Sequence, residues 1–252
     1  MKVVSPESDS SYLTIFSYAE ELALLIKWKA IPLGSLHNLV PKKIHKTYSY
    51  RLADKIVEAS LAQKIKNFRS GFHVLIPSTE ALHSWNPNFA WLSIDKYCRT
   101  AFIASAFFEL PIFSKKIIQF CHEEEVSVDN SDDLRPDFSL GGLSRVSSKP
   151  FEAGVFFETR FSLVPAINPE NKMMMFLEDE KYSVFILVFT TLYALNKCRA
   201  HYFESSNHNY GKKLQKLICL VHIEDYVNHP HELIKSYVYF DGEETTLQEL
   251  FK

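Results

Sequence analysis

Glycine is scarce in this chain, at only 7 of 252 residues. Phosphate-binding loops are built from closely spaced glycines that lead into a helix. The nearest candidate, the stretch YGKKLQK at 210–216, lacks the upstream glycine of such a loop. The sequence therefore carries no signature of a small-molecule coenzyme, and we expect none.

Cysteine is also sparse, and the four cysteines show no paired spacing; they are Cys98, Cys121, Cys198 and Cys219. A disulfide framework or a zinc site would require regularly spaced pairs. The spacings Cys219-x-x-His222 and His229-Pro-His231 do not form two ligand pairs, so the histidines are expected to be ordinary surface or core residues. We expect buried thiols in a reducing compartment and no resident metal.

Long hydrophobic runs are missing. The most apolar stretch, 183–195, is too short to cross a bilayer and is expected to be a buried element. The polar N-terminus does not read as a signal peptide. These features predict a cytoplasmic protein that does not associate with membranes.

Charge is nearly balanced over the whole chain, at −2, but it is unevenly distributed. Residues 27–73 contain ten basic and two acidic side chains, a net charge of +8, so the remainder carries −10. A basic segment on an acidic protein is the electrostatic pattern expected of a local nucleic-acid contact. Charge alone does not separate this interpretation from an ordinary solvated face.

The first third of the chain has the element order of a winged helix-turn-helix. After a polar, frayed stretch at 1–11, apolar periodicity predicts helices at 12–29, 33–41 and 47–61, the third capped by Thr47 or Ser49. Two β-prone runs flank Arg69-Ser70-Gly71 and predict a hairpin, and Ser78 or Thr79 is expected to cap a helix that reaches 85. We assign 12–88 to this domain.

In such a domain the third helix enters the major groove with its N-terminus first. Base contacts are then expected from Tyr48, Ser49, Tyr50 and Arg51, and phosphate contacts from the surrounding basic residues, Lys42, Lys43, Lys46, Lys55, Lys66 and Arg69. Double-stranded DNA is the expected partner. A winged helix used for protein contacts is the alternative.

Residues 89–252 predict an α/β domain with a mixed sheet, which makes the whole chain α+β or α/β in class. We expect a helix at 97–110, a strand at 115–120 and an acidic solvated loop at 121–133. Strands at 135–140 and 154–162 follow, joined by a loop through Gly141, Gly142 and Pro150. A helix at 180–203, a strand at 216–223, a short helix at 229–237 and a strand at 237–242 complete the domain.

The two central strands carry an acidic pattern. Asp137 lies at the first strand, and Glu158 follows 21 residues later as part of Glu158-Thr159-Arg160. In a PD-(D/E)xK nuclease core, carboxylates at these positions hold Mg²⁺ and a lysine two residues later assists the attacking water. Here Arg160 replaces the lysine. Its planar, permanently charged guanidinium can hold a phosphate but is a poor substitute for a compact ammonium.

Together the two halves resemble the replication-relaxation family of plasmid and mobile-element proteins. The resemblance covers about residues 12–203 and rests on YSYRLADKIVEASLAQKI, GFHVLIPSTEAL, YCRTAFIASAFFEL, and RPDFSL followed by VFFETRFS. It implies a winged helix before a degenerate PD-(D/E)xK-like domain and a DNA-linked role in plasmid maintenance, mobilisation or regulation. After Glu158 the family's Lys-and-Tyr helix is replaced by KMMMFLEDEKYSVFILVF.

We favour a dimeric, sequence-specific DNA-binding protein, such as a transcription regulator or a maintenance factor, whose C-terminal domain is not catalytic. One alternative is a Mg²⁺-dependent endonuclease that uses Asp137 and Glu158, with Arg160 beside them. A second is a protein-interaction adaptor with a phenylalanine-rich surface, since the chain contains 20 Phe.

Overall fold

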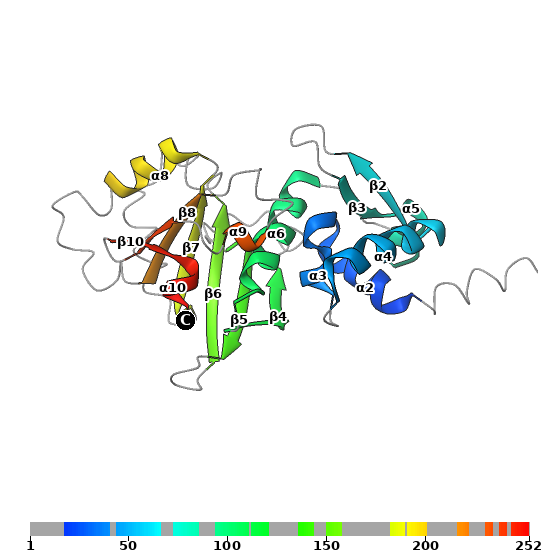
Figure 1. The fold of residues 1–252 in the computed structure, drawn as a ribbon, viewed down its shortest axis with the longest axis horizontal. Helices are drawn as coiled ribbons and strands as arrows, with labels where there is room; N and C mark the ends of the chain where they lie inside the picture. Colours follow the sequence, from blue (N-terminus) through cyan, green and yellow to red (C-terminus); the bar gives the residue numbers. More distant parts are fainter. Residues whose placement is uncertain are drawn as a thin grey trace, which may run out of the picture. The chain divides into compact units, whose positions relative to one another are not determined.

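The computed structural model describes residues 18–40, 44–66, 73–85, 94–110, 112–120, 136–143, 150–157, 182–189, 191–200, 216–221, 230–233, 237–240 and 243–251. The chain forms two compact units (Figure 1). Unit 1 comprises 1–105 with 227–230, and unit 2 comprises 106–226 with 231–252. The helices, the three-stranded sheet and the seven-stranded mixed sheet make the fold α+β in class.

Unit 1 begins with three helical segments. They are α2 (Ala19–Trp28), the 3₁₀ turn η1 (Leu33–Ser35) with α3 (Leu36–Leu39), and α4 (Lys46–Glu58). α2 buries Leu22, Leu25 and Trp28 along one stripe, as apolar spacing at helical period requires. All three segments match expected helices, although residues 1–17, which include the start of the first one, lie outside the described part of the chain.

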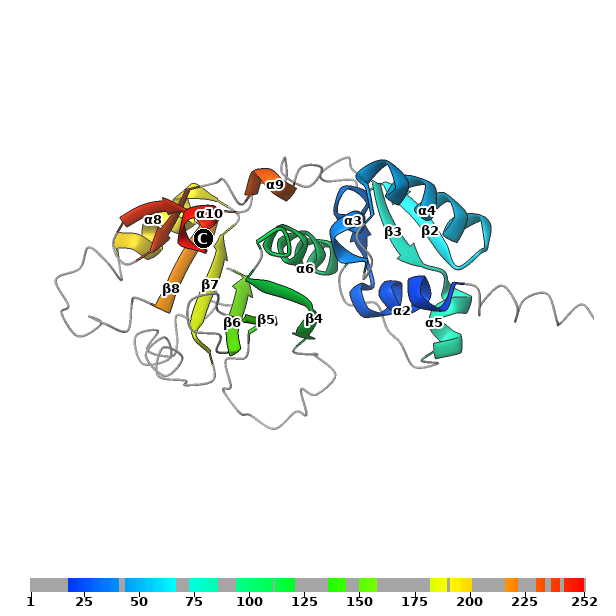
Figure 2. The same cartoon turned by 60° about the horizontal axis from the view of Figure 1, so that its bottom comes forward.

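A small antiparallel sheet completes unit 1. β1 (Ile31–Pro32), β2 (Ala62–Lys66) and β3 (His73–Pro77) are ordered β1-β3-β2, so β3 is central and β2 is an edge. Lys66 pairs with His73, which closes the expected hairpin; its tip, 67–72, is outside the described residues. Figure 2 shows α4 beside β2 and β3. α5 (Thr79–Trp85) follows with Ser78 as its cap, because the Ser78 Oγ accepts from the Ala81 N–H at 3.2 Å.

The division between the units falls inside α6 (Ile94–Phe107), not at the expected boundary of 88–89. The reason lies in the first turns of this helix. Cys98 packs with Ala30 and Val74 of unit 1, and Ile94 and Tyr97 pack against the same cluster. The last two residues of the helix belong to unit 2, where Phe107 makes an edge-to-face contact with Phe113, with centroids 5.1 Å apart. One apolar helix thus contributes to two cores.

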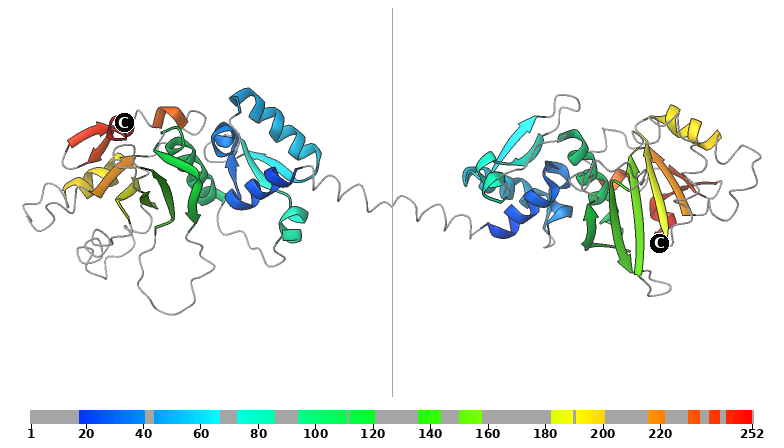
Figure 3. Two further views of the ribbon diagram at one scale, coloured as in Figure 1. Left: turned by 90° about the horizontal axis from the view of Figure 1, so that it is seen from below. Right: turned by 180° about the vertical axis from the view of Figure 1, so that it is seen from behind.

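Unit 2 is built on one seven-stranded sheet ordered β10-β9-β8-β7-β6-β5-β4 (Figure 3). The strands are β4 (Phe113–Phe120), β5 (Phe138–Leu143), β6 (Pro150–Phe157), β7 (Val184–Phe189), β8 (Leu217–Val221), β9 (Tyr237–Phe240) and β10 (Glu243–Thr246). β6, β7 and β8 are mutually parallel, and every other pairing is antiparallel. The helices are α8 (Leu192–Arg199), α9 (Pro230–Leu233) and α10 (Leu247–Leu250).

Two expectations for unit 2 are wrong. The run at 184–189 is strand β7 and not the start of a helix at 180–203; only α8 is helical there. β7 lies between two parallel neighbours with both faces covered, so it needs apolar side chains at every position and shows no alternation.

The predicted loop through Gly141, Gly142 and Pro150 is also wrong. Gly141 and Gly142 lie within β5, and Pro150 opens β6, so none of the three belongs to the loop between these strands. A Cβ on Gly142 would lie 1.8 Å from the Ile112 carbonyl oxygen. Glycine is therefore required here by close backbone approach and not by a turn.

Candidate nucleic-acid interface and acidic pair

The N-terminus of α4 is capped by a histidine. His45 has an extended backbone and its Nδ1 accepts from the Thr47 N–H at 3.2 Å. The helix therefore starts at Lys46, and neither Thr47 nor Ser49, the expected caps, is its N-cap. An accepting imidazole satisfies one of the backbone donors that every helix start leaves without an intrahelical partner.

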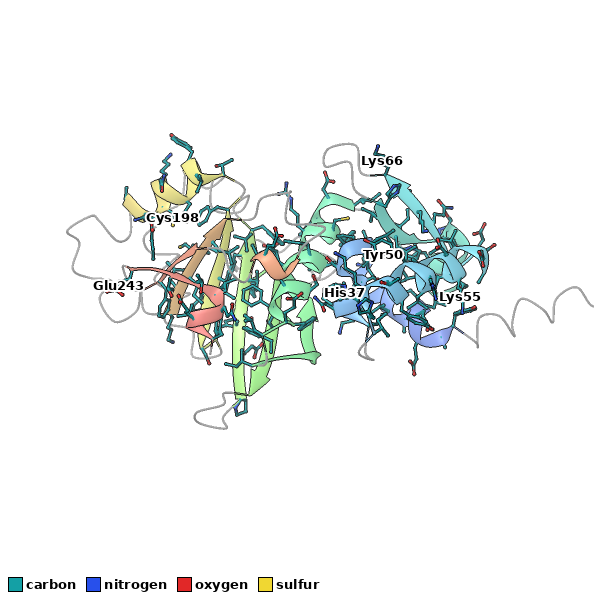
Figure 4. The ribbon with its side chains drawn as sticks, in the orientation of Figure 1. His37, Tyr50, Lys55, Lys66, Cys198 and Glu243 are labelled. Atoms are coloured by element: carbon teal, nitrogen blue, oxygen red, sulfur yellow. The ribbon has the colours of Figure 1, made fainter. Side chains whose placement is uncertain are left out.

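One face of α4 is polar and exposed. Tyr48 is 47% and Tyr50 39% exposed, which is unusual for large aromatic side chains, and Arg51 and Lys55 of the same helix are also exposed. Lys46 is half-buried at the first turn. Figure 4 labels Tyr50 and Lys55 on this helix. The opposite stripe, Leu52, Ala53 and Ile56, is buried in the core of unit 1.

Ser49 is not part of the exposed face, contrary to expectation. Its side chain is fully buried, and its Oγ donates to the Lys46 carbonyl oxygen at 2.6 Å. The residue lies on the buried stripe, three positions before Leu52. Base contact by Ser49 would require its hydroxyl to leave the interior of unit 1.

The edge strand β2 extends the basic surface. Gln63, Lys64 and Lys66 are exposed on it, and Lys66 is its last residue, where the chain enters the hairpin tip (Figure 4). Lys64 Nζ forms an ion pair with the Asp54 carboxylate of α4. This pair ties the strand to the helix and neutralises one of the two acidic side chains on the exposed face of α4. The spacing of Asp54 and Lys64 in the sequence did not predict this ion pair.

Not every basic residue of the +8 segment contributes to this surface. Lys29 Nζ lies 5.0 Å from the centre of the Tyr97 ring, and Lys27 Nζ lies 5.9 Å from that of Trp28. Burial also lowers the pKa of Lys27. Three further residues expected at the interface, Lys42, Lys43 and Arg69, lie outside the described part of the chain.

Asp137 lies immediately before β5, beside the end of β6. Its backbone N–H donates to the Val155 carbonyl oxygen at 2.8 Å, and its Oδ2 accepts from the Phe157 N–H at 2.8 Å. Only 7% of the residue is exposed. The carboxylate therefore satisfies a buried backbone donor on the residue directly before Glu158. This is a structural role that no sequence motif had indicated.

Glu158 and Arg160, the other members of the expected acidic site, lie outside the described residues. Within the described part, no three His, Cys, Asp or Glu side chains gather in a way that could hold a metal ion. In the same ranges no helix is both long enough and apolar enough to cross a membrane.

Comparisons of the chain with protein-family models, with curated proteins and with solved structures found no match.

Proposed function

We propose that this chain is a sequence-specific double-stranded DNA-binding protein that reads DNA with α4 of unit 1. The observation that carries the proposal is the exposure of Tyr48, Tyr50, Arg51 and Lys55 on α4. A buried stripe of the same helix anchors it to a small core. Exposed aromatic and basic side chains on one rigid helix are the usual means of contacting base edges and phosphates.

The topology of unit 1 supports a winged helix-turn-helix. In chain order it runs helix, short strand, helix, helix and hairpin, and the first strand pairs with the last one in a β1-β3-β2 sheet. In that fold α4 enters the major groove and the hairpin lies over the neighbouring backbone. Arg51 and the two tyrosines would then reach base edges, whereas Lys46 and Lys66 would meet phosphates.

Unit 2 is proposed to be a nuclease-derived scaffold. Its antiparallel β4-β5-β6 meander, followed by the parallel strand β7, supports the proposal of a PD-(D/E)xK-like core. The proposal also includes the resemblance to the replication-relaxation family, a role in plasmid maintenance or transcription regulation, and binding as a homodimer in the cytoplasm. Sedimentation of the purified chain with and without a palindromic duplex would test the dimer; one copy per duplex under all conditions would refute it.

The DNA proposal is tested by selecting duplexes from a random pool and titrating the selected and a scrambled duplex by fluorescence anisotropy. Arg51→Ala should weaken binding to the selected duplex by about 1–3 kcal/mol and relax its base preference. Lys66→Ala should weaken binding to both duplexes equally and reduce the slope of log affinity against log salt by about 1. Lys197→Ala, an exposed lysine on α8, is the matched control and should change neither.

Absence of salt-dependent binding at low ionic strength would refute the DNA proposal. So would equal effects of Lys66→Ala and Lys197→Ala, because binding would then not depend on the surface formed by α4 and β2.

A second candidate, a Mg²⁺-dependent endonuclease, is favoured by one observation. The Asp137 carboxylate accepts a hydrogen bond from the Phe157 N–H, and Phe157 is the residue that precedes Glu158 in the sequence. Two carboxylates and waters are a typical Mg²⁺ environment. Incubation of supercoiled and linear DNA with Mg²⁺ or Mn²⁺ tests this function. Cleavage that Glu158→Gln abolishes would support it, and intact DNA with the wild-type chain would refute it.

A further inference from the structure

Two cysteines that lie 21 positions apart in the sequence meet in unit 2. Cys219 is in the middle of β8 and is fully buried, whereas Cys198 is in the last turn of α8 and is partly exposed (Figure 4). α8 packs directly against β8 and its neighbour β7. A hydrogen bond with the Cys198 side chain is the largest of the causes that raise the pKa of the Cys219 thiol. The two cysteine side chains are therefore neighbours at the contact between helix and sheet.

We propose that Cys198 and Cys219 form a reversible disulfide, so that this dithiol is a site of oxidation by small disulfides. The site uses none of the residues that we assign to the DNA-binding surface or to the acidic pair. Disulfide formation needs one cysteine that an external reagent can reach and a second cysteine close to it. Cys198 is partly exposed and can be the first, and the buried Cys219 can be the second. Cys98, by contrast, is buried in the core of unit 1 with no cysteine in its cluster.

The proposed reaction is thiol–disulfide exchange. The Cys198 thiolate attacks a small disulfide such as oxidised glutathione, which forms a mixed disulfide and releases one glutathione thiolate. The Cys219 sulfur then attacks the Cys198 sulfur, the S–S bond to the second glutathione breaks, and the Cys219 proton leaves with that thiol. Two protein thiols lose two electrons in total, and the small disulfide gains both.

The environment of Cys219 favours its reaction with Cys198 over a reaction with external reagents. The hydrogen bond to Cys198 and complete burial raise the pKa of its thiol well above the usual value, which keeps it protonated and shielded from external reagents. The nearby Arg199 guanidinium acts in the opposite direction and favours the thiolate that forms during the second step. Arg199 is held in place by Glu244 of β10, with Nη1 3.0 Å from Oε1.

A disulfide at this position would fasten the end of α8 to β8 and close the loop formed by 199–218. Closing a loop of this length restricts the unfolded chain, so oxidation should raise the midpoint of thermal unfolding by about 5–10 °C. This applies to unit 2, which contains both cysteines.

The test uses the full wild-type chain, incubated with oxidised glutathione and then alkylated under denaturing conditions. Digestion after glutamate separates the two cysteines, because Glu204 lies between them. We expect a crosslinked peptide pair, 181–204 joined to 205–224, that disappears after reduction. Cys98 should be recovered alkylated and serves as the internal control.

Substitution separates the disulfide from general effects of oxidation. Cys198→Ser should eliminate both the crosslink and the thermal shift, whereas Cys98→Ser should retain both. Recovery of both Cys198 and Cys219 as alkylated thiols would overturn the proposal. Crosslinks between two copies of the chain, or stable glutathione on Cys198 without transfer to Cys219, would do so as well.

Discussion

Replacing Asp137 with alanine should destabilise unit 2, because its carboxylate is the acceptor for the buried Phe157 N–H. Alanine would leave this buried donor without its acceptor. A buried donor that loses its charged acceptor costs about 1–3 kcal/mol in the free energy of unfolding. Asp137→Asn retains a carbonyl oxygen at nearly the same position and should cost less than about 1 kcal/mol.

The assay is urea unfolding, and the chain offers an internal control. All three tryptophans, Trp28, Trp85 and Trp91, belong to unit 1, so tryptophan fluorescence monitors that unit, whereas far-UV circular dichroism reports both. Asp137→Ala should lower the midpoint of the component seen only by circular dichroism and leave the fluorescence transition unchanged.

Two results would contradict this reasoning. A stability of Asp137→Ala within about 0.5 kcal/mol of wild type would mean that the hydrogen bond contributes little. Equal destabilisation by Asp137→Ala and Asp137→Asn would mean that the negative charge matters and not the acceptor. The same pair of variants informs the nuclease alternative, because loss of DNA cleavage by the well-folded Asp137→Asn would indicate a catalytic role.

Three further predictions concern local structure. His45→Ala should destabilise unit 1 by about 1 kcal/mol and His45→Asn by less, since asparagine is itself a good cap; equal unfolding midpoints by tryptophan fluorescence would exclude a capping role. Gly142→Ala should destabilise unit 2 clearly, because its Cβ would lie 1.8 Å from the Ile112 carbonyl oxygen, and unchanged urea unfolding by circular dichroism would contradict this contact. Cys98 should make stability depend on alkaline pH. Burial, aided by Asp95, raises the pKa of its thiol to about 12 from 9.0, so the folded state binds the proton more tightly than the unfolded state. The resulting stabilisation should be complete below pH 9.0 and decline as the pH rises toward about 12, and Cys98→Ala should remove this decline in fluorescence-monitored unfolding.

Unit 1 was predictable from its sequence because its signals are local. The apolar stripe of α4 and the turn residues between β2 and β3 each determine structure only a few positions away in the sequence. The helix and the pairing of the two strands both appear where they were expected. The cap of α4 was missed because histidine is not among the common capping residues; only the position of its Nδ1 reveals the role. Ser49 was expected near base edges because it lies at the N-terminus of the helix, although helical spacing from Leu52 puts it on the buried stripe.

Unit 2 was less predictable because its determinants are tertiary. A central parallel strand loses its alternating pattern, so β7 could not be distinguished from a buried helix by periodicity. The Asp137 carboxylate bonds to a backbone N–H, which every residue but proline has, and so leaves no mark in the sequence. Cys198 and Cys219 become a pair only when α8 folds onto β8.

The net charge of the 27–73 segment does not by itself give the number of cations that are available to bind phosphate. Lys27 lies over the ring of Trp28 and Lys29 over that of Tyr97, and Lys64 is bound to Asp54. Each of these cations already interacts within unit 1, and a phosphate would have to compete with that interaction. A DNA contact through the described residues therefore depends on α4 and the end of β2, where the exposed aromatic side chains are also found. Base selection would then come from α4, so single substitutions of its exposed residues should alter specificity and not merely affinity.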